Sequence, residues 1–228
     1  MFLLFITIVN ILSTLVNSLV VKNESELEKS LTTNQKELII QIESELLLSN
    51  NWYIRNDFER LIIKGSGKDK SSLKFKDETH RICFGKEIIW VELQNISVIG
   101  NLYFDHNVRV ELKEVSVTGS IDSSFDGETL NDYIIFNNVL YRSSPYALLT
   151  CINLGGNVQI ENSKFWGGSL CQKRLMHFNG EDKYSFSIKD SYLSGEYGCP
   201  CLEIEHSPNI EILNSVMEKG QCGLNISG

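Results

Sequence analysis

The feature that most constrains the fold is an internal repeat with a usual spacing of 24 residues. Its reference position, here called the bend position, is occupied in successive copies by Asn95, Glu114, Asn138, Asn162, Asp190 and Asn214. Two and four residues before the bend position, every copy carries an apolar residue. Three residues after it the residue is large and mainly apolar, and five after it four of six copies carry glycine. A fixed period of this length is typical of solenoids.

Apolar and polar residues alternate before the bend position, as in a strand with one face exposed to solvent. The alternation shifts by one residue at the bend position, because apolar residues stand at even positions before it and at odd positions after it. Such a shift requires one residue to leave the β region, and Asn and Asp adopt the left-handed region more readily than other non-glycine residues. Each copy is therefore predicted to be two short strands joined by a one-residue bend, with Glu114 as the exception in residue type.

Copies of this kind bury their apolar rows only by stacking on one another, with parallel strands about 4.8 Å apart. The repeat therefore predicts an all-β fold, a right-handed parallel β-helix. Two weaker copies precede the clear ones, with bends at Ser44, after Ile40 and Ile42, and at Gly65, after Ile63. We expect about seven coils in total.

The runs Leu61–Gly67 (LIIKGSG) and Val158–Gly167 (VQIENSKFWG) resemble the pectin-lyase-like right-handed β-helix superfamily, over residues 24–228. In the same resemblance, Leu27 and Leu31 indicate a short N-terminal helix that caps the first coil. The resemblance implies the fold alone, because this superfamily includes lyases, hydrolases, adhesins and inert surface proteins.

The catalytic motifs of that superfamily are mostly absent from the sequence. Its polygalacturonase-like members place paired aspartates before a His-Gly, and neither Asp-Asp nor His-Gly occurs here. The acidic residues near the second clear coil match no calcium-binding template: Asp122, Asp126, Glu128 and Asp132. The four histidines lie outside the repeat positions and are predicted to be loop residues: His80, His106, His177 and His206. No metal or cofactor is expected.

Two carboxylates are the main candidates for catalysis. Glu92 and Glu111 occupy the same outward position of consecutive coils, so their carboxylates could lie about 5 Å apart, as in retaining glycosidases. Such proximity would raise one pKa and suit a general acid. The favoured interpretation is a solvated acidic row whose repulsion is relieved by Lys113.

The N-terminal segment carries no charged side chain before Lys22 and is mostly apolar. Val16 and Ser18 are small enough for a signal-peptidase site, so we predict a signal peptide over residues 1–18 and a β-helix domain over residues 19–228. The alternative is that the same segment is retained as a membrane anchor. Both interpretations place the rest of the chain outside the cytosol, as a secreted or cell-surface protein.

The six cysteines fit an oxidising compartment. Cys171 and Cys199 each stand nine residues after a bend position, so they should stack in adjacent coils, within the Cα range that a disulfide accepts. The predicted disulfides are Cys171–Cys199 and, second, Cys201–Cys222. The other two cysteines are not assigned.

Three N-glycosylation sequons begin at Asn23, Asn95 and Asn225. Asn95 fills a bend position, where its side chain should contact the neighbouring coil. Sugar is therefore predicted on Asn23 and Asn225, with little or none on Asn95.

The net charge of −8, from 21 basic and 29 acidic residues, argues against nucleic acid or an anionic membrane surface as the main partner. Trp166, Tyr192 and Tyr197 fall on outward or loop positions and could stack on sugar rings. We expect a non-catalytic β-helix with a structural, adhesive or carbohydrate-binding role, and polysaccharides or cell-surface glycans as partners. The alternative is a polysaccharide lyase or glycoside hydrolase that uses Glu92 and Glu111.

The last residues of the sequence, 223–228, resemble the start of another coil, and no amphipathic segment follows them. Repeat proteins need a polar cap at each end. We therefore expect an open C-terminal edge that pairs with a partner or continues in a longer protein.

Overall fold

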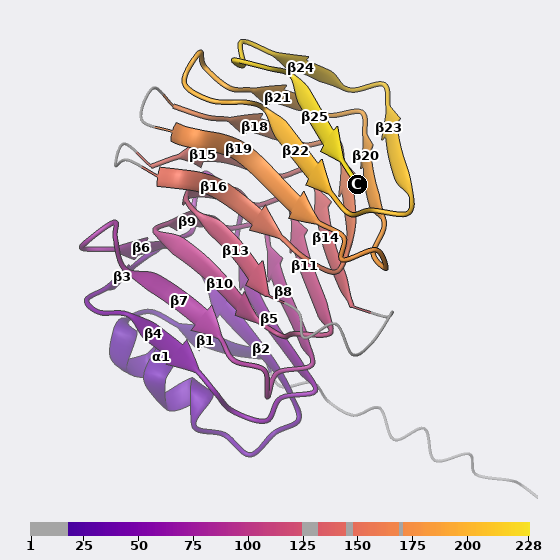
Figure 1. Cartoon of the computed structure of the whole chain (residues 1–228). Coiled ribbons are helices and arrows are strands. Elements are labelled where there is room, and N and C mark those ends of the chain that lie inside the picture. Colours follow the sequence, from indigo (N-terminus) through magenta and orange to yellow (C-terminus); the bar gives the residue numbers. More distant parts are fainter. Residues whose placement is uncertain (1–17, 125–131, 145–147, 169–170) are drawn as a thin grey trace, which may run out of the picture.

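Three parallel sheets wind around one axis in the computed structural model, which describes residues 18–124, 132–144, 148–168 and 171–228 (Figure 1). The helix α1 (Glu24–Leu31) lies at one end of the solenoid, and the chain passes coil by coil to its last strands at the other end. Each coil contributes one strand to each sheet. The predicted parallel β-helix is therefore confirmed.

The first sheet has nine strands. In spatial order they are β1 (Ser18–Val21), β2 (Glu37–Ile42), β5 (Arg60–Gly65), β8 (Trp90–Gln94), β11 (Arg109–Lys113), β14 (Tyr133–Asn137), β17 (Asn157–Glu161), β20 (Phe186–Lys189) and β23 (Ile210–Leu213).

The second and third sheets have eight strands each. The second contains β3 (Glu45–Leu48), β6 (Ser72–Phe75), β9 (Ser97–Ile99), β12 (Ser116–Gly119), β15 (Leu140–Ser143), β18 (Lys164–Trp166), β21 (Tyr192–Ser194) and β24 (Val216–Glu218). The third contains β4 (Trp52–Ile54), β7 (Arg81–Phe84), β10 (Asn101–Asp105), β13 (Ile121–Ser124), β16 (Leu148–Leu154), β19 (Cys171–Asn179), β22 (Leu202–Glu205) and β25 (Leu224–Ser227).

The bend positions separate the first sheet from the second, as the sequence predicts. All six residues have φ between 47° and 55°, in the left-handed region. Glu114 shares this conformation at φ 55°, so the position in the coil imposes it even on a residue that does not favour it. The apolar positions before and after the bend pair in register through all six clear coils.

The first coil differs from the prediction. Ile40 pairs with Ile63 and Ile42 with Gly65, so Ile42 and not Ser44 holds the place that corresponds to Gly65. The predicted alignment was wrong by two residues, because a shift of two leaves the same side chains on the same face of a strand. Eight strands in both the second and third sheets also give eight coils, one more than predicted.

The predicted N-terminal cap is confirmed. Asn23 is the N-cap of α1, and its Oδ1 accepts a hydrogen bond from the backbone N–H of Glu26 at 2.9 Å. Leu27 and Leu31 are buried against the first coil. The predicted signal peptide falls on residues 1–17, outside the described residues, and on Ser18, which begins β1. Among the described helices, none is long and apolar enough to span a bilayer.

The core fills the interior of the coils with stacked apolar side chains. Phe84 and Phe104, in adjacent coils, stack with ring centres 5.2 Å apart. At the C-terminal edge, β23, β24 and β25 pair on one side only and leave apolar side chains exposed, among them Val216 and Ile226.

Candidate functional site

The outer face of the third sheet carries one side chain from every coil at the same position. We call this set the third-sheet row. The backbone register joins its eight residues in an unbroken series: Tyr53, Cys83, Tyr103, Asp122, Asn153, His177, Glu203 and Asn225.

The first half of the row is aromatic and basic. Tyr53 is 49% exposed, and the guanidinium of Arg55 lies 5.7 Å from the centre of its ring. Arg81 lies 5.7 Å from the ring centre of Tyr103. Cys83 is covered by these neighbours, and burial raises the pKa of its thiol. This half of the row therefore offers ring faces flanked by hydrogen-bond donors.

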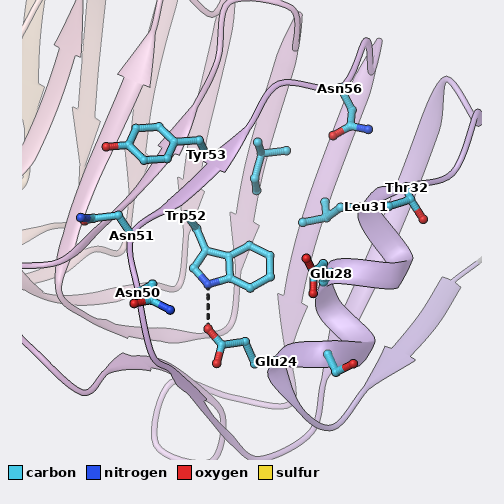
Figure 2. Close-up of a pocket in the computed structure, with 11 residues that line it drawn as sticks. Glu24, Glu28, Leu31, Thr32, Asn50, Asn51, Trp52, Tyr53 and Asn56 are labelled. Carbon is cyan, nitrogen blue, oxygen red and sulfur yellow. Dashed lines mark hydrogen bonds between the residues drawn. The ribbon is translucent and has the colours of Figure 1, made fainter.

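Two hollows adjoin this half. One, of about 550 Å³, lies between α1 and β4 and is lined mainly by polar groups, together with Trp52 and Tyr53 (Figure 2). The indole Nε1 of Trp52 donates to Oε1 of Glu24 at 3.0 Å. Burial would raise the pKa of Glu24, but hydrogen bonds from Ser49 and Trp52 outweigh this and lower it. A second hollow, of about 290 Å³, includes Arg81, Tyr103 and Asp122 among its walls.

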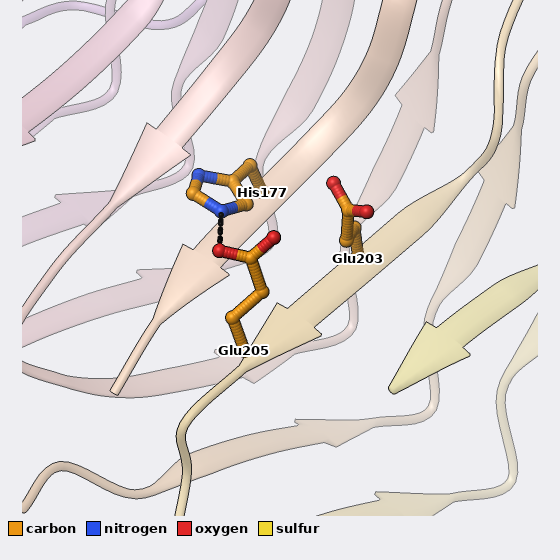
Figure 3. Close-up of side chains that lie close together, drawn as sticks. All are labelled: His177, Glu203 and Glu205. Atoms are coloured by element: carbon orange, nitrogen blue, oxygen red, sulfur yellow. Dashed lines mark hydrogen bonds and ion pairs between the residues drawn. The ribbon is translucent and has the colours of Figure 1, made fainter. Parts of the chain in front are cut away.

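The second half of the row is a connected polar network. Asn153 donates through Nδ2 to Asp122 at 3.1 Å, and its Oδ1 lies 2.8 Å from Nδ1 of His177. Nε2 of His177 lies 3.3 Å from Oε2 of Glu205. Figure 3 marks this contact with a dashed line. Asn225 donates to Oε1 of Glu203 at 3.0 Å. A hollow of about 220 Å³ is lined by His177 and Asn153, among other residues.

The placement of His177 corrects the prediction that all four histidines lie in loops, since it stands inside β19. The other three lie between strands, as predicted. β19 contains an irregularity opposite β16, where Leu148 pairs with Cys171 but Thr150 pairs with Arg174. The extra residue in β19 is a bulge, a feature that re-aims side chains. From Thr150 and Arg174 onward the register is regular, and Asn153 pairs with His177. The sequence pattern did not place His177 on the row because the connections between the second and third sheets differ in length from coil to coil.

The two glutamates considered for catalysis are adjacent, as predicted, but are not solvated. Glu92 pairs in register with Glu111, and their side chains are each 1% exposed. Arg60 and Lys113 bind Glu92 at 2.7 and 2.9 Å, and Lys113 also binds Glu111. The predicted role of Lys113 is confirmed, whereas the predicted exposure is wrong. A substrate has no access to either carboxylate.

Trp90 lies two residues before Glu92 in β8 and contacts two of the surrounding arginines. Its ring lies between the guanidinium groups of Arg60, at 3.8 Å, and Arg109, at 4.8 Å. Arg109 also binds Glu111. Burial alone would raise the pKa of Glu92, but the hydrogen bonds that it accepts, first from Arg60, outweigh burial and lower it. We call Arg60, Trp90, Arg109, Lys113 and the two glutamates the charged cluster, and its geometry is that of a stabilising network.

The predicted aromatic site lies elsewhere, on and beside the second sheet. Trp166 and Tyr192 have ring centres 6.0 Å apart with planes inclined by 53°, and Arg142 covers Trp166 at 4.8 Å. The hydroxyl of Tyr192 donates to Glu218 at 2.6 Å. Tyr197 is 75% exposed. Since the first two rings are tilted and engaged by neighbours, they form no flat platform.

Cys171 and Cys199 lie near each other, as the repeat predicts, although all six cysteines are free thiols here. Cys171 contacts both Cys151, with the two Sγ atoms 3.1 Å apart, and Cys199. Cys201 donates its backbone N–H to the carbonyl of Cys222 at 3.0 Å. The pairing of Cys171 with Cys199 and of Cys201 with Cys222 stays a prediction, and Cys151 is a competing partner that spacing did not identify.

The three sequon asparagines differ in surroundings. Asn23 is exposed but caps α1, and Asn225 is exposed and bonded to Glu203. Asn95 is half-buried at a bend. Glycosylation of Asn23 and Asn225, and not of Asn95, stays a prediction. Of the acidic residues near β13, Asp126 and Glu128 lie outside the described residues.

Comparison of the chain with protein-family models, with curated proteins and with solved structures gives no match. The β-helix fold by itself does not indicate a function, because one architecture supports many activities. The function is therefore argued from the third-sheet row.

Proposed function

We propose that the protein is a secreted or cell-surface β-helix that binds a linear polysaccharide along the third-sheet row. The observation that carries this proposal is the continuity of the row across eight strands. At a strand spacing of about 4.8 Å, seven steps extend about 34 Å. An extended chain of sugars matches such a narrow, straight surface better than a compact ligand does.

The chemistry of the row supports a sugar ligand. Tyr53 and Tyr103 offer ring faces for the apolar faces of sugars. Asn153, His177 and Asn225 offer amide and imidazole groups that exchange hydrogen bonds with hydroxyls. The adjoining hollows give room for side groups of the polymer.

The extracellular location rests on the sequence. The apolar segment before Lys22, the three sequons and the six cysteines all favour it. We also infer that the chain is a non-catalytic relative of the pectin-lyase-like β-helices, on the basis of its three parallel sheets and left-handed bends. A reaction at Glu92 and Glu111 is not part of the proposal, because both are buried.

The test is retention and cleavage of a panel of plant and microbial polysaccharides, measured by affinity electrophoresis and by product analysis. We expect retention without cleavage. The double variant Tyr53→Ala/Tyr103→Ala should bind at least about 10-fold more weakly, since stacking contributes about 1 kcal/mol per ring. Tyr197→Ala removes an exposed ring away from the row and should change binding less than about twofold.

Three results would contradict the proposal. The first is that no polysaccharide in the panel is retained. The second is equal binding by the double variant and the unaltered chain. The third is loss of binding in Trp166→Ala alone, which would assign the site to the second sheet.

A further inference from the structure

A second feature of the third sheet is a cluster of nitrogen and oxygen ligands near its C-terminal end. His177 on β19 and Glu203 and Glu205 on β22 point toward one another (Figure 3). One ligand atom from each lies within 4.8 Å of the other two. All three side chains are partly buried, so their solvation is incomplete.

The hydrogen bonds around His177 determine its tautomer. A carboxylate only accepts hydrogen bonds, so Asp122 must receive the bond from the amide nitrogen of Asn153. The amide oxygen of Asn153 therefore faces Nδ1 of His177, and this oxygen also only accepts. Nδ1 consequently carries a proton. In a neutral imidazole, the lone pair then lies on Nε2.

That lone pair faces a carboxylate oxygen of Glu205 at 3.3 Å. Two electron pairs in this position repel each other unless a proton or a metal cation lies between them. We propose that the cluster binds a divalent transition metal of the Zn²⁺ type through Nε2 of His177 and one oxygen each of Glu203 and Glu205. In tetrahedral zinc sites, with bonds near 2.0–2.2 Å, neighbouring ligand atoms are about 3.4 Å apart, which is close to the observed 3.3 Å.

Neighbouring groups hold the ligands in place. Arg174 binds Oε2 of Glu203 and lies 3.8 Å from Oε1 of Glu205, which leaves Oε2 of Glu205 directed at His177. Asn225 donates to the other oxygen of Glu203. Metal-binding histidines usually donate their second N–H to an oxygen in this way, and their ligating carboxylates are also hydrogen-bonded.

The charge of the site favours a dication. The carboxylates of Glu203, Glu205 and Asp122 contribute −3, Arg174 contributes +1, and an imidazole that coordinates a metal contributes nothing, which leaves −2. An imidazole nitrogen among the ligands favours a transition metal over Ca²⁺ or Mg²⁺, which prefer oxygen alone. Three protein ligands leave a fourth position for water or a ligand group.

The experiment titrates the metal-free chain with ZnCl₂, CoCl₂ and CaCl₂ by calorimetry, without any polysaccharide, so its outcome is independent of the proposed function. We expect one equivalent of Zn²⁺ to bind, and Co²⁺ to give visible absorption bands of four-coordination. Calcium should bind at least about 100-fold more weakly. His177→Ala and Glu205→Gln should each abolish the saturable phase.

Two further variants distinguish a specific metal site from a general effect of substitutions on Zn²⁺ binding. Asn153→Leu removes the acceptor on Nδ1 without touching a ligand, and should weaken Zn²⁺ about 10- to 100-fold. His106→Ala removes a histidine that contacts Asp105 outside the cluster, and should leave Zn²⁺ binding unchanged. Unchanged circular dichroism and urea midpoints of the metal-free variants serve as the folding control.

The proposal is overturned if Zn²⁺ does not bind saturably, since His177 would then balance its neighbours with a proton alone. It is also overturned if His177→Ala binds Zn²⁺ as tightly as the unaltered chain.

Discussion

The substitution Glu92→Gln in the charged cluster tests how much a buried ion network on the outside of a coil stabilises the solenoid. Glu92 accepts hydrogen bonds from Arg60 at 2.7 Å and from Lys113 at 2.9 Å, and its side chain is 1% exposed. Glutamine has nearly the same shape and keeps one acceptor, but removes the charge. The variant therefore leaves the cations of the cluster with one carboxylate, that of Glu111.

We expect Glu92→Gln to lower the free energy of unfolding by about 2–3 kcal/mol. Removing one partner of a fully buried pair costs about 3–5 kcal/mol. The side chains of Arg60 and Lys113 are 32% and 42% exposed, so water can partly solvate them, and the expected cost lies at or just below the lower end of that range. For a chain of this size, each kcal/mol lowers the midpoint of thermal unfolding by about 2–4 °C, which predicts a decrease of about 4–12 °C.

The pH dependence has a definite sign. The folded-state pKa of Glu92 is lowered, because the hydrogen bonds from Arg60, Lys113 and Gln94 outweigh the effect of burial. Its stabilisation is therefore fully present above the unfolded pKa of about 4.3 and is lost as the pH falls through the lower folded pKa. The difference in the free energy of unfolding between Glu92→Gln and the unaltered chain should be constant near neutral pH and should shrink below about pH 4.

Urea unfolding followed by tryptophan fluorescence is the assay, since Trp90 lies within the cluster. The matched control is Glu211→Gln, at the corresponding outward position of β23, where the side chain is exposed. The free energy of unfolding of this control should lie within about 0.5 kcal/mol of that of the unaltered chain. Equal stability of Glu92→Gln and Glu211→Gln at pH 7, or a difference that grows as the pH falls, would refute the reasoning.

Two other features make separate predictions. Peptide mapping of the non-reduced secreted chain should find Cys171 bonded to Cys199. A bond from Cys171 to Cys151, whose sulfur is 3.1 Å away, would instead show that the sulfur contact in the folded structure determines the disulfide, and not the repeat spacing. Gly119→Ala should destabilise the chain by about 3 kcal/mol or more in urea unfolding, because φ is 151° and a Cβ would lie 1.9 Å from a carbonyl oxygen of the preceding coil. Gly223→Ala, whose Cβ would meet nothing within 3.7 Å, should be nearly neutral, and a similar loss in both variants would contradict this explanation.

The sequence predicts the fold well because its bend positions combine two signals. One is the shift in the alternation of apolar and polar residues, and the other is the Asn or Asp that stands at most of the bends. Where one signal is missing the prediction weakens. In the first coil the apolar alternation runs through Leu38 and Ile40 to Ile42, which itself holds the bend position, so no Asn or Asp marks the bend.

The burial of Glu92 was not predicted. The alternation in the sequence shows that its side chain lies on the outer face of the sheet, but not which other side chains cover it there. Arg60 and Lys113 bind Glu92 from the coils on either side, and Trp90 lies two residues before it in the same strand.

Most of the candidate site could not be predicted from the sequence. His177 and the two glutamates come from adjacent strands, but His177 pairs with Glu203 at a spacing of 26 residues, whereas the bend positions of the same coils, Asn162 and Asp190, are 28 residues apart. The third-sheet row carries a different residue type in nearly every coil, so it leaves no periodic signal. Only the register of the backbone reveals that Tyr53 and Asn225 belong to the same line.

The parallel register of the coils also determines how the protein would respond to mechanical tension. Hydrogen bonds between coils run along the axis, so a pull on the two ends of the chain loads one coil at a time and peels it from the next. A coil of 24 residues would release about 80 Å of extended chain, and the 19- and 28-residue coils would give shorter and longer steps. A disulfide between Cys171 and Cys199 would prevent extension of the segment between them, which is 28 residue steps or about 95 Å long, and the corresponding step would be missing from the force trace.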